Sequence, residues 1–397
     1  MTARRRRRIL PAVLAVGLLL AGCSAEGAGT AGATAPIAGA TVSPTLSPTP
    51  TPPTVAERAA AIVARMSRSE RAGQALMTAG TVSQLPGLAP AVRRYHLAGV
   101  MVRGRSGAGT AAVAKAFRPV RSAAPEGLPL LTATDQEGGL VQVLSGPGFS
   151  TIPRATVQGG LPLRTMRADA RTWGTQLAKA GVRLDLAPVA DVPCASTLHD
   201  NPPIAGLDRQ YSSDPGHAGE HVAAFVAGMR SAGVATAVKH FPGLGCVRAN
   251  TDTSRRVVDS VTTASSVRLK AFAAGIDGGT AFVMMSSAEY SRIDPGTPAL
   301  FSSRIIRGLL RERLGFDGVV MSDDVGGARA VARWTPGQRA VRFVRAGGDL
   351  LLDVAPADIG PMHGALVDQA GRSPAFDAQL TAAAERVVAA RLALPAS

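Results

Sequence analysis

Residues 235–243 of this chain read ATAVKHFPG, a short apolar run that leads directly into Lys239 and His240. A run of this length is typical of a buried strand. An amphipathic stretch with helical spacing, His217–Ser231, precedes it. The same alternation of short apolar runs and amphipathic stretches extends in both directions along the chain, so this segment is one unit of a repeated β–α pattern.

Eight strands are expected in all, with helical stretches between them. The strands are expected at Gln74–Thr78, Gly99–Arg103, Leu128–Thr134, Arg183–Val189, Ala235–Lys239, Ala281–Ser286, Gly318–Ser322 and Asp349–Val354. Helices are expected at Val55–Arg71, Asp169–Ala180, His217–Ser231, Ser303–Leu314, Gln338–Arg345 and Ala375–Leu392. Eight alternations predict an α/β fold, a (β/α)8 TIM barrel in a single catalytic domain. The alternative is an open doubly wound sheet, but the residues after the first strand, 79–82, do not form its Gly-rich phosphate loop.

The amino-terminal residues predict export. Arg4–Arg8 are basic, Ile9–Leu20 are apolar, and small residues follow up to Cys23. This order describes a secretory signal that is too short to span a bilayer comfortably. Leu20–Cys23 resembles a bacterial lipobox, which implies a lipoprotein signal peptide over residues 1–22 and lipidation of Cys23. An uncleaved anchor is the alternative.

Residues 23–53 are rich in Ala, Gly, Thr, Ser and Pro and are expected to form a disordered tether. The barrel domain is expected over residues 54–397. The protein is then anchored outside the cytoplasm, in the cell envelope, through the lipid on Cys23 only, and shedding from the membrane is left open. The net charge of +15 invites a nucleic-acid partner, but export and the spread of the arginines favour a solvated basic surface near anionic envelope polymers.

Two cysteines, Cys194 and Cys246, remain once Cys23 is lipidated. They follow the fourth and fifth strands, which are neighbours in a barrel, and an exported chain meets an oxidising environment. A disulfide between them is therefore expected. No Cys and His spacing resembles a zinc site, and no metal or cofactor is expected.

Unusual polar clusters follow several of the expected strands. They are Asp135–Gly139 after the third strand, Asp191 and Asp208–Arg209 after the fourth, Lys239–Gly243 after the fifth and Ser322–Asp324 at the seventh. Any one of them alone could be a helix cap or a satisfied core pair. Together, at the carboxyl-terminal ends of barrel strands where function gathers, they predict an active site.

The clusters also carry a family resemblance. Asp135–Gly139 with Val141-Gln142 resembles the Asp-Gln-Glu-Gly-Gly-Arg-Val-Gln signature of glycoside hydrolase family 3, and Lys239–Gly243 resembles the signature of its single-domain β-N-acetylglucosaminidases. Phe316–Asp324 resembles the nucleophile strand of that family, and Leu207–Arg209 resembles its Gly-Asp-Arg loop. The order and spacing agree across residues 70–330.

The resemblance implies a retaining glycosidase in which Asp323 is the nucleophile. It further implies that four side chains bind the sugar through charge-assisted hydrogen bonds. These are Asp135, Arg209, Lys239 and His240.

The sequence departs from the family at the acid/base. The family has an Asp–His dyad after its Lys-His-Phe-Pro-Gly signature, where this chain has Asn250 and Asp252. Two arginines of the family signature are replaced by Leu140 and Val143. We therefore expect a carboxylic acid as acid/base, which can serve near neutral pH only with a raised pKa. Asp252 is the first candidate, Glu289 the second and His199 the third.

Only two Trp and three Tyr occur in the chain. Because extended sugar grooves usually offer aromatic platforms, a short exo-acting pocket is expected. The predicted function is release of terminal β-linked N-acetylglucosamine, an amino sugar, from cell-envelope-derived glycans. The alternatives are a catalytically impaired sugar-binding lipoprotein on the same barrel, and a β-glucosidase or phosphorylase of the same family.

Overall fold

The computed structural model describes residues 52–395. The expected signal peptide, nearly all of the expected tether, and Cys23 lie outside the described residues.

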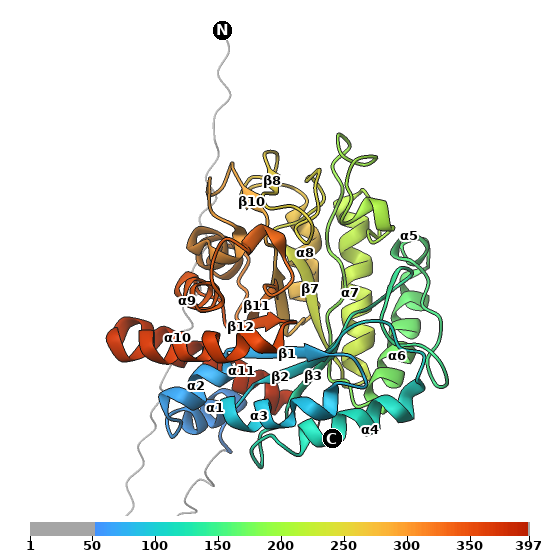
Figure 1. The fold of residues 1–397 in the computed structure, drawn as a ribbon. Helices are drawn as coiled ribbons and strands as arrows, with labels where there is room; N and C mark the ends of the chain where they lie inside the picture. Colours follow the sequence, from blue (N-terminus) through green and yellow to red (C-terminus); the bar gives the residue numbers. More distant parts are fainter. Residues whose placement is uncertain (1–51, 396–397) are drawn as a thin grey trace, which may run out of the picture. The chain divides into compact units, whose positions relative to one another are not determined.

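Eight parallel strands close into a barrel (Figure 1). The order around the barrel is β1-β2-β3-β6-β7-β9-β11-β12, so each strand pairs with its neighbours in chain order. The strands are β1 Leu76–Gly80, β2 Gly99–Val102, β3 Leu131–Thr134, β6 Leu184–Asp185, β7 Ala235–Phe241, β9 Phe282–Met285, β11 Val319–Asp324 and β12 Leu350–Asp353. This confirms the predicted (β/α)8 barrel and excludes the open sheet.

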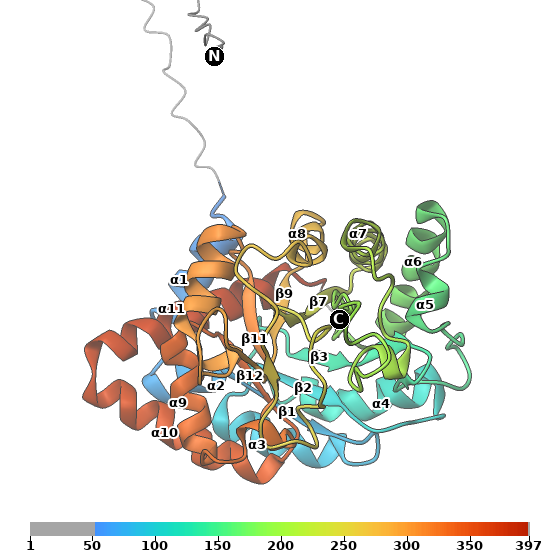
Figure 2. The ribbon, with the colours of Figure 1, turned by 90° about the horizontal axis from the view of Figure 1, so that it is seen from above.

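Helices surround the strands, as the view from above shows (Figure 2). They are α1 Val55–Val63, α2 Arg68–Gln74, α3 Ala89–Tyr95, α4 Gly109–Arg121, α5 Ala155–Gln158, α6 Leu163–Lys179, α7 Pro215–Ser231, α8 Leu269–Asp277, α9 Pro336–Ala346, α10 Ile359–Arg372 and α11 Pro374–Ala393. The π-helical segment η4 spans Arg304–Arg313, and short 3₁₀ segments lie at η1 Leu85–Leu88, η2 Ala205–Leu207, η3 Ala299–Phe301, η5 Arg329–Val331 and η6 Pro356–Asp358.

Two expected elements need correction. The single helix predicted over Val55–Arg71 is two helices, because Ser67 starts the second one with a capping box to Glu70. The strand predicted over Arg183–Val189 is confined to β6, because Pro188 has no backbone N–H to give to a ladder.

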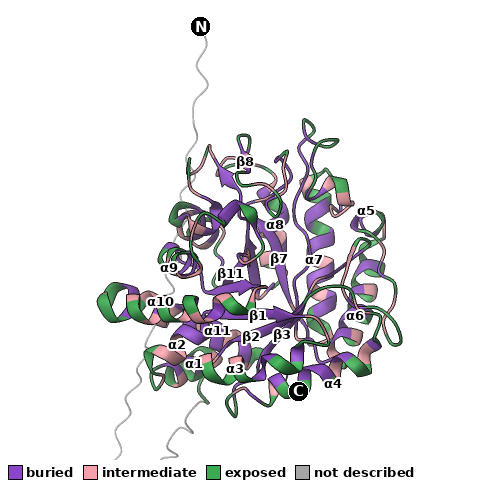
Figure 3. Ribbon diagram, viewed as in Figure 1, coloured by how far each residue is buried: buried purple, intermediate pink, exposed green. Residues whose placement is uncertain are grey.

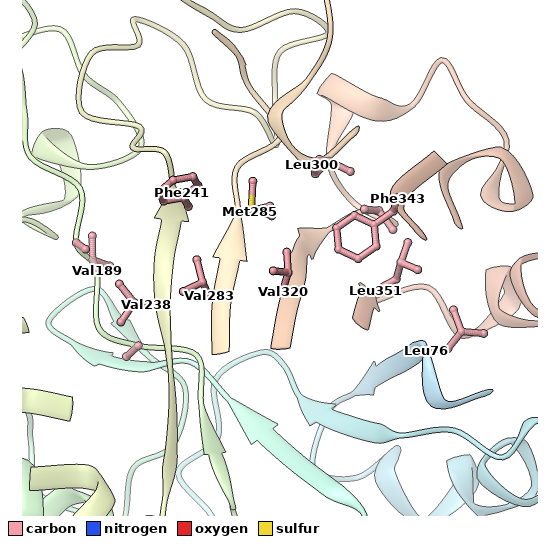
Figure 4. Close-up of a cluster of buried hydrophobic side chains, with 14 of the residues drawn as sticks. Leu76, Val189, Val238, Phe241, Val283, Met285, Leu300, Val320, Phe343 and Leu351 are labelled. Carbon is pink, nitrogen blue, oxygen red and sulfur yellow. The ribbon is translucent and has the colours of Figure 1, made fainter. Parts of the chain in front are cut away.

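Alternate strand residues face two different cores. Inward-facing side chains such as Phe282, Met284 and Met321 fill the barrel interior. Their neighbours Val283 and Val320 belong to a second cluster, drawn in the close-up, which also includes helix residues such as Phe343 (Figure 4). The strands are accordingly buried on both faces, whereas the helices present exposed outer surfaces (Figure 3). This two-sided burial fixes the register and leaves the site to polar residues at the strand ends and in the loops that follow them.

The loops after the strands form two small sheets of their own. The strand β4 Gln136–Gly138 pairs antiparallel with β5 Val141–Gln142 in the loop after β3. The strand β8 Val258–Asp259 pairs with β10 Glu289–Tyr290, which joins the loops after β7 and β9. These sheets hold the loops over the carboxyl-terminal end of the barrel.

Candidate active site

A cavity of about 420 Å³ opens at the carboxyl-terminal ends of the barrel strands. Its walls include the predicted nucleophile, the first acid/base candidate and the four side chains predicted to bind the sugar. These are Asp135, Arg209, Lys239, His240, Asp252 and Asp323. The cavity lies in the lower part of the size range of ligand pockets, which suits a short ligand.

Four charged side chains form a buried network on one wall of this cavity. Lys239, at the end of β7, places its Nζ 2.7 Å from Asp135 Oδ1 and 2.6 Å from Glu137 Oε1. Arg209 holds the same Glu137 through two bonds, Nε to Oε2 at 2.8 Å and Nη2 to Oε1 at 2.7 Å. Such a bidentate contact fixes both partners in direction as well as in distance.

Glu137 is a site residue that the sequence analysis did not single out, although it lies inside the Asp-Gln-Glu-Gly-Gly motif. Burial pushes the pKa of Glu137 upward, but Arg209 and Lys239 outweigh it and lower that pKa to about 2. The carboxylate is therefore ionised at any working pH. Its charge lets two cations remain buried in the cavity wall, which a protein otherwise rarely tolerates.

Asp185, a second residue to which the sequence assigned no role, holds the backbone that carries Asp135 and Glu137. It ends β6 and is fully buried, and its Oδ1 accepts the Gln136 N–H at 3.0 Å. That bond fixes the backbone between Asp135 and Glu137. Burial raises the pKa of Asp185 to about 8, so this carboxyl group is mostly protonated at neutral pH. A lone Asp within an apolar strand was the only sequence signal for it.

His240 is oriented by Asp191. Its Nδ1 lies 2.7 Å from Asp191 Oδ2, and its Nε2 lies 3.3 Å from Arg209 Nη2. Because a carboxylate only accepts and a guanidinium only donates, the ring proton belongs on Nδ1 and Nε2 accepts. Asp191 Oδ1 also accepts the Leu244 N–H at 2.7 Å, so one carboxylate fixes both the imidazole and the following loop.

The two aspartates that end β11 differ in what they bind. Asp324 accepts three loop N–H groups, from Gly326, Gly327 and Val354, at 2.8 to 3.1 Å. The Asp323 carboxylate accepts one, the Asp324 N–H on its Oδ1 at 2.9 Å. Within the described residues its Oδ2 has no hydrogen-bond partner, so this oxygen is available to a ligand in the cavity.

Asp323 is also perturbed electrostatically. Burial raises its pKa to about 6, and the Asp252 carboxylate acts in the same direction. A carboxylate with a raised pKa in a cleft is a common feature of catalytic sites.

Asp252 reaches the cavity from the loop after β7. Asn250 Oδ1 accepts its backbone N–H at 2.9 Å, and the neighbouring Thr251 carbonyl accepts the Ala330 N–H at 3.0 Å. The second contact fastens this loop to the segment that follows β11. The loop that carries Asp252 is thus held against the segment that follows Asp323 and β11.

The other two acid/base candidates lie outside the cavity walls. Glu289 is buried in β10. Its Oε2 lies 3.3 Å from Arg256 Nε, and its Oε1 lies 3.7 Å from Arg333 Nη2. His199 is exposed on the loop after β6. Of the three candidates, only Asp252 lies beside Asp323.

The predicted disulfide between Cys194 and Cys246 is present, with the two Cα atoms 5.0 Å apart. Asn201 reinforces this connection, because its Nδ2 donates to the carbonyls of Leu244 and Val247, both at 2.8 Å. The loops after β6 and β7 are therefore tied to each other. No group of three or more His, Cys, Asp or Glu within residues 52–395 is arranged to hold a metal ion.

Comparisons with known proteins agree with this architecture. The family model described as "Glycosyl hydrolase family 3 N terminal domain" matches residues 70–390. A β-hexosaminidase of Xylella fastidiosa (strain M23) is 38% identical over 238 residues, which cover 58% of this chain and 68% of that protein. A β-hexosaminidase of Xanthomonas campestris pv. campestris (strain B100) is 34% identical over 271 residues, 66% of this chain and 78% of that protein.

Among solved structures, the β-N-acetylhexosaminidase of Beutenbergia cavernae DSM 12333 is similar to this chain, with 47% identity and a TM-score of 0.80. The similarity covers 83% of this chain and 99% of that one.

Proposed function

Because this chain belongs to glycosyl hydrolase family 3, we propose that it is an exo-acting, retaining β-N-acetylglucosaminidase that releases terminal sugars from cell-envelope-derived glycans. The observation that carries the proposal is the Asp323 carboxylate. It lies in a cavity the size of a short ligand, and one of its oxygens has no hydrogen-bond partner within residues 52–395. The β-hexosaminidases similar to this chain support the choice of sugar.

Asp323 attacks the anomeric carbon as the bond to the leaving oxygen breaks, which gives a covalent glycosyl–enzyme intermediate. Water then displaces Asp323 by attacking the opposite face, the one that the leaving group vacated, so two inversions give net retention. The free Oδ2 is suited to the attack, whereas the Asp324 oxygens are already occupied by three backbone N–H groups.

The charged network holds the sugar. Asp135 accepts sugar hydroxyl groups, while Lys239 and Arg209 donate to them. Because Glu137 keeps both cations in fixed positions, little reorganisation is needed when the sugar enters.

Asp252 is the acid/base in this proposal. It protonates the leaving oxygen in the first step and takes a proton from the attacking water in the second. Its place on the cavity wall beside Asp323 supports the assignment over Glu289 and His199.

The protein is further proposed to be a lipoprotein, anchored outside the cytoplasm through Cys23. Its support is the amino-terminal sequence alone. Among the described residues, no helix has the length and apolar character needed to cross a membrane. Metabolic labelling with an alkyne fatty acid should tag the wild-type protein and not Cys23→Ser. Equal labelling of both would contradict the anchor.

Residues 52–397 form one compact unit and provide the sample for the test of activity. We expect this unit to hydrolyse 4-nitrophenyl N-acetyl-β-glucosaminide well above the matching glucoside. Addition of phosphate should leave the product as free sugar rather than sugar phosphate.

The absence of the family's dyad favours a second candidate, a sugar-binding lipoprotein with impaired catalysis. Saturable binding of N-acetylglucosamine without turnover would support that candidate. A preference for the glucoside, or formation of a sugar phosphate, would instead indicate the β-glucosidase or phosphorylase.

A further inference from the structure

One cation in the cavity wall differs from the others. Arg103 follows β2 directly and lines the cavity, yet its side chain is exposed. In contrast, Lys239 is buried and Arg209 is largely buried, and both are bound to carboxylates. Among the described residues, the Arg103 guanidinium has neither an ion pair nor a hydrogen bond. It is therefore a charged donor that the protein itself leaves unused.

The backbone around Arg103 is well fixed. Its N–H donates to the Gly80 carbonyl at 3.0 Å, which continues the pairing of β2 with β1. Gly104 follows with φ of +74°, a conformation that other residues rarely adopt. The next arginine, Arg105, lies outside the cavity walls and donates to the Leu140 carbonyl at 2.9 Å. The two arginines thus have separate roles, one in bracing the loop and one in lining the cavity.

Exposure places Arg103 at the mouth of the cavity. The buried Lys239 and the largely buried Arg209 lie deeper, where the terminal sugar binds in the proposed function. Asp252, the proposed acid for the leaving oxygen, is exposed in the same way as Arg103. The part of the substrate that meets Arg103 is therefore the leaving group rather than the terminal sugar.

The balance of carboxylates and cations on the cavity walls bears on the charge of the leaving group. Carboxylates outnumber cations along its walls, because Asp135, Glu137, Asp252, Asp323 and Asp324 all contribute. An anionic leaving group is repelled by such a wall unless a free cation compensates. Arg103 is the cavity cation without a carboxylate partner among the described residues, and a guanidinium matches a planar carboxylate with two parallel hydrogen bonds.

We propose that Arg103 binds a carboxylate on the leaving group and makes the enzyme selective for acidic N-acetylglucosaminides. This inference rests on the proposed function and adds a specificity determinant to it. Arg103 contacts the substrate away from the reacting atoms, so its contribution is to binding, and its loss is felt mainly in KM.

The test compares two leaving groups of the same shape. The 3- and 4-carboxyphenyl N-acetyl-β-glucosaminides carry the charge, and the corresponding carbamoylphenyl glycosides do not. We expect the wild type to favour at least one carboxyphenyl substrate by about five- to tenfold in kcat/KM. The lower value is typical of a partly exposed ion pair, and the higher value is typical of a charge-assisted hydrogen bond. High salt should reduce that ratio.

Variants assign the preference to Arg103. Arg103→Gln should bring the ratio to about one, through a higher KM for the charged substrate, and Arg103→Lys should restore part of it. Arg164→Gln, an exposed arginine on α6 outside the cavity, makes the same change in net charge and should leave the ratio as it is.

The outcomes separate the two proposals. If the wild type hydrolyses neither kind of substrate, the proposed function fails and this inference with it. If it hydrolyses both kinds equally well, or if the preference survives Arg103→Gln, the role of Arg103 alone is overturned.

Discussion

The two ends of the barrel differ in how completely their carboxylates are bonded within the protein. At the amino-terminal end, Asp349 precedes β12 and receives Arg311 Nη2 and the Val320 N–H on one oxygen and Arg386 Nε on the other. Both of its oxygens are thus occupied. At the carboxyl-terminal end, Asp323 keeps an oxygen with no partner among the described residues.

The difference separates stability from function. A carboxylate that is fully bonded within the protein has nothing left to offer a substrate, and breaking its pairs costs folding free energy. A carboxylate that is left incompletely bonded destabilises the free protein. This cost is offset only when a bound substrate supplies the missing contact. In a TIM barrel the first kind belongs to the amino-terminal face and the second to the carboxyl-terminal face.

The largest expected effect is on turnover at the carboxyl-terminal end. Asp323→Asn should lower kcat by about 10⁴-fold or more, because it removes the proposed nucleophile. Its Tm should be unchanged or higher, since it also removes a poorly stabilised charge. A fluorinated glycoside that traps the intermediate should label Asp323, as peptide mass spectrometry would report. An Asn variant with near-normal kcat would end the assignment.

The second effect depends on the leaving group. Asp252→Ala should lower kcat/KM by about 10³-fold for an alkyl glycoside, whose leaving oxygen needs a proton. An activated dinitrophenyl glycoside should lose far less. Similar losses for both substrates would remove Asp252 from the acid role and direct attention to Glu289 and His199, for which the corresponding Glu289→Gln and His199→Ala variants provide the comparison.

The third effect is on stability at the opposite end. Asp349→Ala should lower the free energy of unfolding by about 3 kcal/mol, because it leaves two arginines without their carboxylate. Turnover per folded molecule should remain normal. Asp377→Ala is the matched control, since Asp377 pairs with Arg71 at a partly exposed site and should cost no more than about 1 kcal/mol. Urea unfolding measures both, and equal losses would argue against the contrast between buried and exposed pairs.

Much of the fold was predictable because the pattern of short apolar runs repeats eight times, and each repeat constrains the others. The motif residues at the strand ends could be placed at one rim for the same reason. The partners Glu137, Asp185 and Asp191 were not assigned roles, since a hydrogen-bond network depends on side-chain directions that spacing along the chain does not specify. The break between α1 and α2 was missed because a Ser followed by Glu three residues later was overlooked as a capping box.

The smallest expected effect is a shift in pH dependence. Burial raises the pKa of Asp323 to about 6, and the nearby Asp252 carboxylate contributes in the same direction. Only the ionised form of Asp323 can attack. For a substrate whose departure needs no acid, kcat/KM should therefore be constant above this pKa and fall as the pH drops below about 6.

Replacement of Asp252 by Asn removes the like charge, favours ionised Asp323 and should move the acidic limb to lower pH. The dinitrophenyl glycoside is the substrate for this profile, because its departure does not require the acid that Asp252→Asn lacks. Leu244→Ile changes a cavity residue without changing charge and should leave the limb in place. If the acidic limb does not move in Asp252→Asn, the two carboxylates do not interact. The contact between the Asp252 loop and the segment after β11 would then have no electrostatic role in the reaction.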